Sequence, residues 1–581
     1  PPLKTCPRDR PSGLPPGNSF TTNPDPVAAQ IVAAAFGYNQ GNSLAGGSNY
    51  AYGGACANAA GPCVNPAAPR LGQQLGQYLT PRGGRADGNA LYTVWMGAND
   101  IFAALGGGVW TTQPQIQAGT TTVATSVVGN VLALQNAGAN YIVIFNLPDL
   151  GRTPQFLGAG ATAAGAASFA AVSYNTALNQ GLLSARDGII PVNTFALVNE
   201  VIADPGKFGF ANVVGTACTG PGAPSSVACG PVGSGLPYTY AAGANNSFFF
   251  ADGVHPTGAA HAILAKVILA TIAAPGHVSL AGEVPLQVYE DHSGAINYQL
   301  FSSRAAGREI GEGGGYARLQ FGDQTYDGSD YSPELDSNLA TLTAGADFRH
   351  SETFSFGGAL SLGRSNGDAD TGSLNGTEFL GSVYGVAQFG QGYINAIASG
   401  GSNSLEINRT LQLGPNFRTE EGKTDATHLA FELGGGFDFG SGDLHHGVFG
   451  NLVWQNVSVD GYAEETNTAT TMRFSEFERD SLTWRIGYQI EGKSGRWSPY
   501  ARIAYAAETE DDISHVQAGS TSMNGTFTLA GYEPSGDWIE ADIGVTMDFN
   551  ETSQLFFGYQ GHLNDDAQSR NSLNAGVRMT F

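Results

Sequence analysis

The chain has 581 residues, 82 of them glycine, and a net charge of −24. Its length exceeds what one hydrophobic core usually serves, so at least two domains are expected. The acidic balance argues against nucleic acid as a partner, because phosphate binding needs a basic face. Residues 1–275 hold 9 acidic and 10 basic side chains, whereas residues 276–581 hold 41 and 16. A charge step of this size marks a domain boundary.

The first thirteen residues, PPLKTCPRDRPSG, contain no apolar core of a signal peptide and no strand pattern. If the protein is exported, we expect its leader to have been removed or left out of this chain. No uninterrupted apolar run has the length of a transmembrane helix.

All five cysteines lie in the first half, with Cys6 left over from two close pairs. The pairs Cys56/Cys63 and Cys218/Cys229 suit two small disulfide loops formed outside the cytosol. Free buried thiols are the alternative. No pair has the C-x-x-C spacing of a zinc site, and we expect no metal or cofactor.

Three apolar runs in the first half have the length of buried strands: Ala90–Met96, Tyr141–Leu147 and Ile189–Phe195. Helical patterns alternate with them, as in Ala259–Ala274. This alternation predicts a parallel sheet covered on both faces, with its chemistry at the carboxyl ends of the strands.

Five ordered blocks lie at or near those strand ends. They are Ser19–Pro26 (SFTTNPDP), Gly47–Ala55 (GSNYAYGGA), Val94–Ile101 (VWMGANDI), Gly138–Pro154 (GANYIVIFNLPDLGRTP) and Ala251–Thr257 (ADGVHPT). Each block alone is a weak signal, but their order and spacing resemble those of the SGNH (GDSL) family of serine esterases and lipases. The resemblance implies an α/β, three-layer domain that hydrolyses esters.

The resemblance also implies roles for four residues. His255 would take the proton of a hydroxyl nucleophile, and Asp252 would orient the imidazole and stabilise its charged form. Asn99 Nδ2 and the Gly54 N–H would donate to the oxyanion. The structural alternative for Asp252 and His255 is a helix cap with a surface histidine, and for Asn99 it is plain turn chemistry.

The family's nucleophile lies in a G-D-S-L block after the first strand, and no such block is present here. Ser12 and Ser19 are the nearby serines, and neither has those surroundings. Either the gene has lost or scrambled its 5′ end, or the domain is a non-catalytic descendant that still binds something. Both explanations predict weak hydrolysis and an open gap in the parallel sheet.

Residues 286–304 (LQVYEDHSGAINYQLFSSR) are the candidate for a pore helix, with Pro285 at its start, where proline is tolerated. An ordinary linker is the alternative.

From about residue 314 the sequence alternates in stretches long enough to cross a membrane as tilted strands. In Ile539–Phe549 the apolar side chains fall on one face and Glu540 and Asp542 on the other. Thr353–Gly363 and Gln554–Leu563 repeat the pattern. Carboxylates suit a wet lumen and would be costly inside a soluble sandwich. The G-x-S-x-G match at residues 363–367 is interpreted as a loop between strands, without catalysis.

The connections alternate in length, as in outer-membrane barrels. Phe549–Thr552 is a short turn, whereas residues 323–338 and 459–475 form long polar loops. The last strand ends on Phe581, and this end resembles the C-terminal signature of bacterial outer-membrane proteins. The roughly twelve strand-like segments resemble the autotransporter family, whose translocator is a twelve-stranded barrel with a helix through its pore.

These observations predict three parts: an esterase-like passenger (residues 1–275), a linker and pore helix (276–312), and an all-β transmembrane barrel of about 12 strands (313–581). We expect a monomer in the bacterial outer membrane with the passenger on the cell surface. Its partners would be an ester or lipid substrate, membrane lipid and the barrel assembly machinery, not nucleic acid. The rival interpretation is a non-catalytic binding protein or adhesin.

Overall fold

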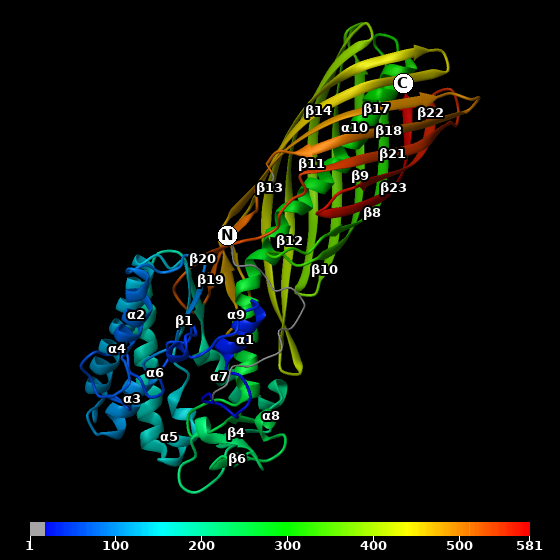
Figure 1. The fold of residues 1–581 in the computed structure, drawn as a ribbon. Helices are drawn as coiled ribbons and strands as arrows, with labels where there is room; N and C mark the ends of the chain where they lie inside the picture. The colour runs from blue at the N-terminus through cyan, green and yellow to red at the C-terminus, as the bar shows by residue number, and fades with distance from the viewer. Residues whose placement is uncertain (1–17, 511) are drawn as a thin grey trace.

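A computed structural model describes residues 18–510 and 512–581. In it, an N-terminal domain of helices and short strands lies at one end of a β-barrel, and a long helix runs from the domain into the barrel (Figure 1). The helices of the N-terminal domain are α1 (Ala28–Ala35), α2 (Leu71–Leu79), α3 (Ala98–Gly106), α4 (Gln113–Asn136), α5 (Pro154–Gly158), α6 (Ala161–Leu182), α7 (Thr194–Ala203), α8 (Ala244–Ser247) and α9 (Gly258–Ser279). Its strands are β1 (Leu91–Val94), β2 (Tyr141–Phe145), β3 (Ile189–Val192), β4 (Asn212–Thr216), β5 (Cys229–Pro231), β6 (Tyr238–Tyr240) and β7 (Phe248–Phe250).

The three strands expected from the apolar runs form one parallel sheet in the order β1-β2-β3. Alternate side chains of β2 point to opposite faces. Ile142 and Ile144 join a core built with α4 and α6, whereas Val143 and Phe145 join one built with α1 and α9. This confirms the three-layer α/β arrangement, in which a parallel sheet is buried on both faces.

Strand β1 is less buried than its neighbours, since its residues are half-buried or exposed while those of β3 are all buried. Among the described residues, its second edge has no strand partner. That is the open side of the sheet expected from a sequence without the family's first strand.

The barrel closes in the strand order β10-β11-β12-β13-β14-β17-β18-β21-β22-β23-β8-β9, which makes twelve strands. They are β8 (Gly313–Tyr326), β9 (Leu335–Arg349), β10 (Phe354–Ala369), β11 (Gly372–Phe389), β12 (Gly392–Leu413), β13 (Asn416–Ser441), β14 (Leu444–Val459), β17 (Phe477–Gly492), β18 (Trp497–Glu508), β21 (Asp537–Asp548), β22 (Ser553–Leu563) and β23 (Gln568–Thr580). Closure leaves no free edge, which a bilayer demands of a sheet.

The predicted faces of the strands are confirmed. Phe356 and Leu360 point outward, 46% and 55% exposed, and Ile543 does the same on β21. Asp542 faces inward and is buried. The turn at residues 549–552 also stands where it was expected.

Two local predictions were wrong. Gly363–Gly367 lies inside β10, not in a loop, because the strands on both sides pair along its whole length. The loop expected over 323–338 is shorter, since β8 continues to Tyr326 and β9 begins at Leu335. Both stretches are rich in polar residues. Polarity alone does not distinguish a loop from a barrel strand whose inward-facing side chains contact water.

The expected long loop at 459–475 folds on itself. It contributes β15 (Tyr462–Ala463) and β16 (Met472–Phe474), which form a small sheet with β19 (His515–Ser520) and β20 (Phe527–Ala530). That sheet lies between the barrel and the N-terminal domain (Figure 1).

The pore helix α10 (Glu283–Ala306) follows α9 through a single turn of 3₁₀ helix, Leu280–Gly282. It is longer than the predicted 286–304 at both ends, and the boundary expected at residue 275 falls within α9. The continuous helix, Gly258–Ala305, is long and apolar enough to cross a membrane, with a window of mean hydropathy 1.7, although Lys266 interrupts its apolar run. Because 78% of that window is buried within the protein, burial explains its apolar character.

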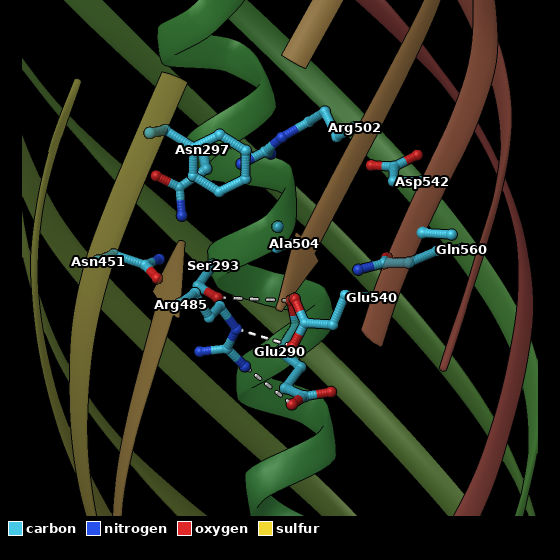
Figure 2. Close-up of a pocket in the computed structure, with 13 residues that line it drawn as sticks. Glu290, Ser293, Asn297, Asn451, Arg485, Arg502, Ala504, Glu540, Asp542 and Gln560 are labelled. Atoms are coloured by element: carbon cyan, nitrogen blue, oxygen red, sulfur yellow. Dashed lines mark hydrogen bonds and ion pairs between the residues drawn. The ribbon is translucent and has the colours of Figure 1, made fainter. Parts of the chain in front are cut away.

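Ion pairs attach α10 to the barrel wall. Arg479 Nε lies 2.7 Å from Glu283 Oε1, and Arg304 Nε lies 2.8 Å from Asp438 Oδ2. In the middle, Arg485 bridges Glu290 of the helix and Glu540 of the wall, at 3.1 and 2.8 Å (Figure 2). Breaking a buried pair leaves an uncompensated charge, so these contacts fix the helix at one depth in the pore.

Gly363 lies against the pore helix, and a larger side chain at this position is expected to destabilise the filled barrel. A Cβ at this position would lie 2.6 Å from Val288 Cγ2 of α10, so Gly363→Val should destabilise the filled barrel by about 1–3 kcal/mol. The temperature at which the barrel loses its heat-modifiable mobility on SDS gels measures this. Gly400→Val is the control, because a Cβ there meets Leu429 at an ordinary 3.6 Å on the outer surface. Equal effects of both substitutions would show that the helix tolerates displacement.

Candidate active site

Asp252 and His255 lie on the turn that connects β7 to α9. The imidazole Nδ1 of His255 is 2.9 Å from both carboxylate oxygens of Asp252. The Asp252 Oδ1 atom also accepts the backbone N–H groups of Val254 and His255, at 3.0 and 2.8 Å. The side chain that caps α9 is Thr257, which accepts from the Ala260 N–H. The alternative in which Asp252 caps the helix is therefore wrong.

The Asp252 carboxylate is held in its charged form. Burial by itself raises the pKa of Asp252, but the hydrogen bond and charge of His255, together with backbone N–H donors, lower that pKa well below its ordinary value. The His255 side chain is 38% exposed and Asp252 only 5%. A buried anion behind a partly exposed imidazole is the arrangement that fixes a histidine tautomer with Nε2 free to accept a proton.

Asn99 and Gly54, the two expected oxyanion donors, lie on segments that contact each other. Asn99 Nδ2 donates to Ala55 O at 2.9 Å from the first turn of α3. Gly54 has φ +71°, and a Cβ there would lie 2.7 Å from Asn65 Cβ, so this position requires glycine. The Gly54 N–H donates no hydrogen bond to any described residue. One amide hydrogen of Asn99 and the Gly54 N–H are thus available to an external oxygen.

Both predicted disulfides are present. Cys56–Cys63 closes the loop beside Gly54, and Cys218–Cys229 closes a second loop beside Asp252. Cys6 lies outside the described residues.

Phe20 connects the two halves of the site, which the sequence blocks did not reveal. Its ring centroid is 4.7 Å from that of His255, and a Cβ on Gly53 would lie 2.5 Å from its Cζ. The aromatic residue in the block at 19–26 was the available signal, but nothing in its spacing indicates a histidine 235 residues later.

A hydroxyl nucleophile is not found beside His255. Over residues 18–510 and 512–581, no serine hydroxyl is hydrogen-bonded to its imidazole. Ser12 lies outside the described residues. Ser19 donates its backbone N–H to Asn23 Oδ1, and its hydroxyl makes no hydrogen bond to His255.

Asp100 anchors the loop that follows Gly54. Its carboxylate accepts the N–H groups of Ala57 and Asn58 at 2.9 and 3.0 Å, and burial raises its pKa against the opposing effect of those donors. The Asp100 carboxylate therefore holds this loop in place, and no other role is required.

Asp100→Asn is expected to destabilise the N-terminal domain by about 1.5–3 kcal/mol, because an amide offers one acceptor where the carboxylate offered two. Hydrogen exchange of the amides at 57 and 58, measured by mass spectrometry on the full chain, should rise. Asp87→Asn is the matched control, since Asp87 is exposed and, among the described residues, its carboxylate accepts only the N–H of Asn89. Unchanged exchange at 57 and 58 would contradict this anchoring role.

Glu290, Glu540 and His562 converge within 4.8 Å in the barrel lumen. Arg485 pairs with both glutamates, and Arg570 also pairs with Glu290. Two guanidinium groups already balance these carboxylates, so the charge does not favour a metal ion.

Comparison with known proteins identifies both halves. Residues 13–268 match the family model described as GDSL-like Lipase/Acylhydrolase, and residues 315–560 match the Autotransporter beta-domain, a barrel of the outer membrane. "Lipase 1" of Photorhabdus luminescens is 25% identical over 95% of this chain and 91% of its own length. "Esterase EstA" of Pseudomonas aeruginosa is 28% identical over 97% of this chain and 87% of its own length.

Among solved structures, the translocator domain of the autotransporter NalP from Neisseria meningitidis is 17% identical, with a TM-score of 0.41, and covers 51% of this chain and 98% of its own. The two family matches divide the chain where the charge step and the change of fold divide it. The chain is an autotransporter whose passenger domain belongs to the GDSL-like lipase/acylhydrolase family.

Proposed function

We propose that this protein is a surface-displayed carboxylesterase or lipase of the outer membrane that works by a Ser-His-Asp mechanism. His255 is the general base, Asp252 orients it, and Asn99 Nδ2 and the Gly54 N–H stabilise the oxyanion. The observation that carries the proposal is the Asp252–His255 pair, at 2.9 Å, with the carboxylate buried and the imidazole accessible. Ester or lipid substrates are proposed from the same chemistry, since relatives of this chain are named lipase and esterase.

The reaction proceeds in two halves. The serine Oγ attacks the ester carbonyl carbon while its proton passes to His255 Nε2, and Asp252 stabilises the imidazolium through Nδ1. The negative charge on the carbonyl oxygen is stabilised by the Asn99 and Gly54 donors, each contributing a few kcal/mol. The alkoxy C–O bond then breaks as Nε2 returns the proton to the leaving alcohol. Water repeats the sequence on the acyl-enzyme and releases the acid.

The nucleophile is the part that the described residues do not supply. We expect the chain as given to hydrolyse p-nitrophenyl butyrate weakly, because no serine of residues 18–510 and 512–581 offers His255 a hydroxyl to activate. A version preceded by a strand ending in Gly-Asp-Ser-Leu should exceed it by about 10³-fold or more in kcat/KM. If the chain as given is fully active and His255→Ala abolishes that activity, the nucleophile argument is wrong. If the extended version is inactive, the esterase proposal fails.

The second candidate is a non-catalytic surface binding protein or adhesin. It is favoured by one observation, that no described serine hydroxyl contacts His255. It predicts attachment of cells that display the chain to surfaces, and it predicts that the attachment survives both His255→Ala and Asn99→Ala. Loss of attachment with either substitution would contradict it.

A further inference from the structure

We propose that the disulfide-closed loop Cys218–Cys229 is a positioning element for the Asp252–His255 pair. It acts on Asp252 through the backbone N–H of Ser226 and on His255 through Asn23 and Phe20. This inference rests on the proposed function for its effect on hydrolysis, but the contacts that carry it are independent of the nucleophile.

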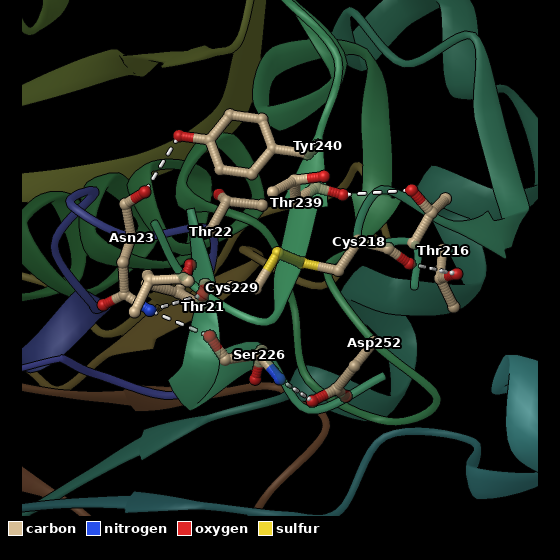
Figure 3. Close-up of a disulfide and its surroundings, with 12 residues drawn as sticks. Thr21, Thr22, Asn23, Thr216, Cys218, Ser226, Cys229, Thr239, Tyr240 and Asp252 are labelled. Carbon is tan, nitrogen blue, oxygen red and sulfur yellow. Dashed lines mark hydrogen bonds between the residues drawn. A yellow bond between two sulfur atoms is a disulfide. The ribbon is translucent and has the colours of Figure 1, made fainter. Parts of the chain in front are cut away.

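The first arm reaches Asp252 directly. The Ser226 N–H donates to Asp252 Oδ2 at 2.7 Å (Figure 3). The other two backbone donors to this carboxylate, Val254 and His255, come from its own turn and both bind Oδ1. Ser226 therefore holds the oxygen that those donors leave free. Without it Oδ2 keeps only the contact with the His255 imidazole, so the backbone holds the carboxylate through Oδ1 alone and the acceptor for the imidazole is less fixed.

The loop that carries Ser226 has little regular structure of its own. Residues 219–228 read TGPGAPSSVA and form a single short 3₁₀ turn, Ser226–Ala228. The disulfide is fully buried at both ends. At one end the Cys218 N–H donates to Ala251 O, next to Asp252, at 2.9 Å. The cross-link restricts a chain segment that would otherwise lose the geometry of its turn.

The second arm reaches His255 through Asn23. The Asn23 N–H donates to Cys229 O at 3.2 Å, and Asn23 Nδ2 donates to Ser226 O at 2.8 Å. The Asn23 side chain also closes a turn on Ser19, accepting the Ser19 N–H at 2.7 Å and donating to Ser19 O at 3.0 Å. That turn presents Phe20, whose ring lies against His255. One loop thus fixes both members of the pair.

Ser226→Pro removes the N–H donor with little other change. Ser226 is the first residue of the 3₁₀ turn, where proline is tolerated, and the preceding Ser225 is extended (φ −117°, ψ 120°), as a residue before proline must be. Ser226→Ala is the matched control, because the Ser226 hydroxyl is buried without a partner and the alanine keeps the N–H.

Hydrogen exchange of the full chain in detergent, read by mass spectrometry on peptides that cover residues 252–257, tests the proposal. Exchange there should quicken about 10-fold in Ser226→Pro and in the double variant Cys218→Ala/Cys229→Ala, and stay unchanged in Ser226→Ala. Cys56→Ala/Cys63→Ala should quicken exchange at 53–65 but not at 252–257. Peptides of α4 and α6 report whether each variant is folded. Unchanged exchange at 252–257 in folded Ser226→Pro overturns the proposal.

Hydrolysis gives the second readout, in the version that carries the Gly-Asp-Ser-Leu block. Ser226→Pro should lower kcat about 10- to 100-fold with KM within about twofold, because substrate binding does not use Asp252. A rise in KM with kcat intact overturns the positioning role. If hydrolysis is absent from the parent while exchange responds as expected, the proposed function fails and the positioning contact stands.

Discussion

His255→Ala is expected to lower kcat/KM for p-nitrophenyl butyrate by about 10⁴-fold or more in the version that carries the serine. The substitution removes the acceptor for the serine proton and the donor for the leaving alcohol, so both halves of the reaction lose their proton transfer. Asp252→Ala should cost about 10³- to 10⁴-fold, since the imidazole remains but its tautomer is no longer fixed. The two losses should not add in the double variant, because the residues act as one unit.

The matched control for this experiment is His515→Ala, a substitution of an exposed histidine whose Nδ1 contacts only the carbonyl of Ile513. It should leave kcat/KM unchanged. A loss below about tenfold for His255→Ala would show that another group serves as the base.

Met523→Asp is expected to destabilise the passenger by about 3–5 kcal/mol, although Met523 belongs to a loop of the barrel. Its side chain is 4% exposed and is part of the passenger core that contains Ile144, Val127 and Leu178. An aspartate at this position would bury an unpaired carboxylate and empty the space that the methionine fills. Thermal unfolding of the full chain in detergent, followed by protease sensitivity of the passenger, measures the effect.

The contacts around Met523 explain why the loss should not stay local. The Gly188 and Ile189 N–H groups both donate to Thr526 O at 2.8 Å, so the barrel loop covers the outer edge of β3. Asn524 donates two hydrogen bonds to Asn179 of α6, and Asn193 donates to Ser522 at 2.8 Å. A covered edge strand is protected from wrong pairing, so the barrel completes the passenger on this side.

Thr521→Asp is the control for Met523→Asp, because Thr521 is exposed in the same loop and the same charge is introduced. It should lower the unfolding temperature of the passenger by less than a third of the effect at Met523. If Met523→Asp leaves the passenger as resistant to protease as the parent chain, its core does not depend on the barrel loop.

An ion pair strengthens the same interface. Arg418 Nη2, at the tip of the β12–β13 hairpin, lies 2.6 Å from Glu200 Oε2 of α7, and Glu200 also accepts the Ala469 N–H. The passenger is thus held by two barrel loops and a hairpin as well as by the helix that connects them. An anchored passenger is consistent with the proposal that it acts at the cell surface while attached to the membrane.

The local pattern of the sequence was sufficient for much of this structure. Strict alternation, as in Ile539–Phe549, has one structural solution when carboxylates share the strand with lipid-facing side chains, so the barrel and its faces could be predicted. The apolar runs of β2 and β3 predicted a sheet buried on both sides. Asp252 and His255, three residues apart on one turn, had to meet, because no tertiary contact is needed to bring them together.

Only the tertiary structure decided the contacts between segments that are distant in the sequence. Ser226 is 26 residues from Asp252, Phe20 lies on His255, and Met523 enters a core more than 300 residues away in sequence. Such contacts leave no period or motif in the sequence, since each depends on where two separately folded elements dock. The sequence determined a barrel, an esterase-like sheet and the Asp252–His255 pair. The docked structure determined that a disulfide loop binds Asp252 through the Ser226 N–H and that a barrel loop enters the core of the domain that the barrel carries.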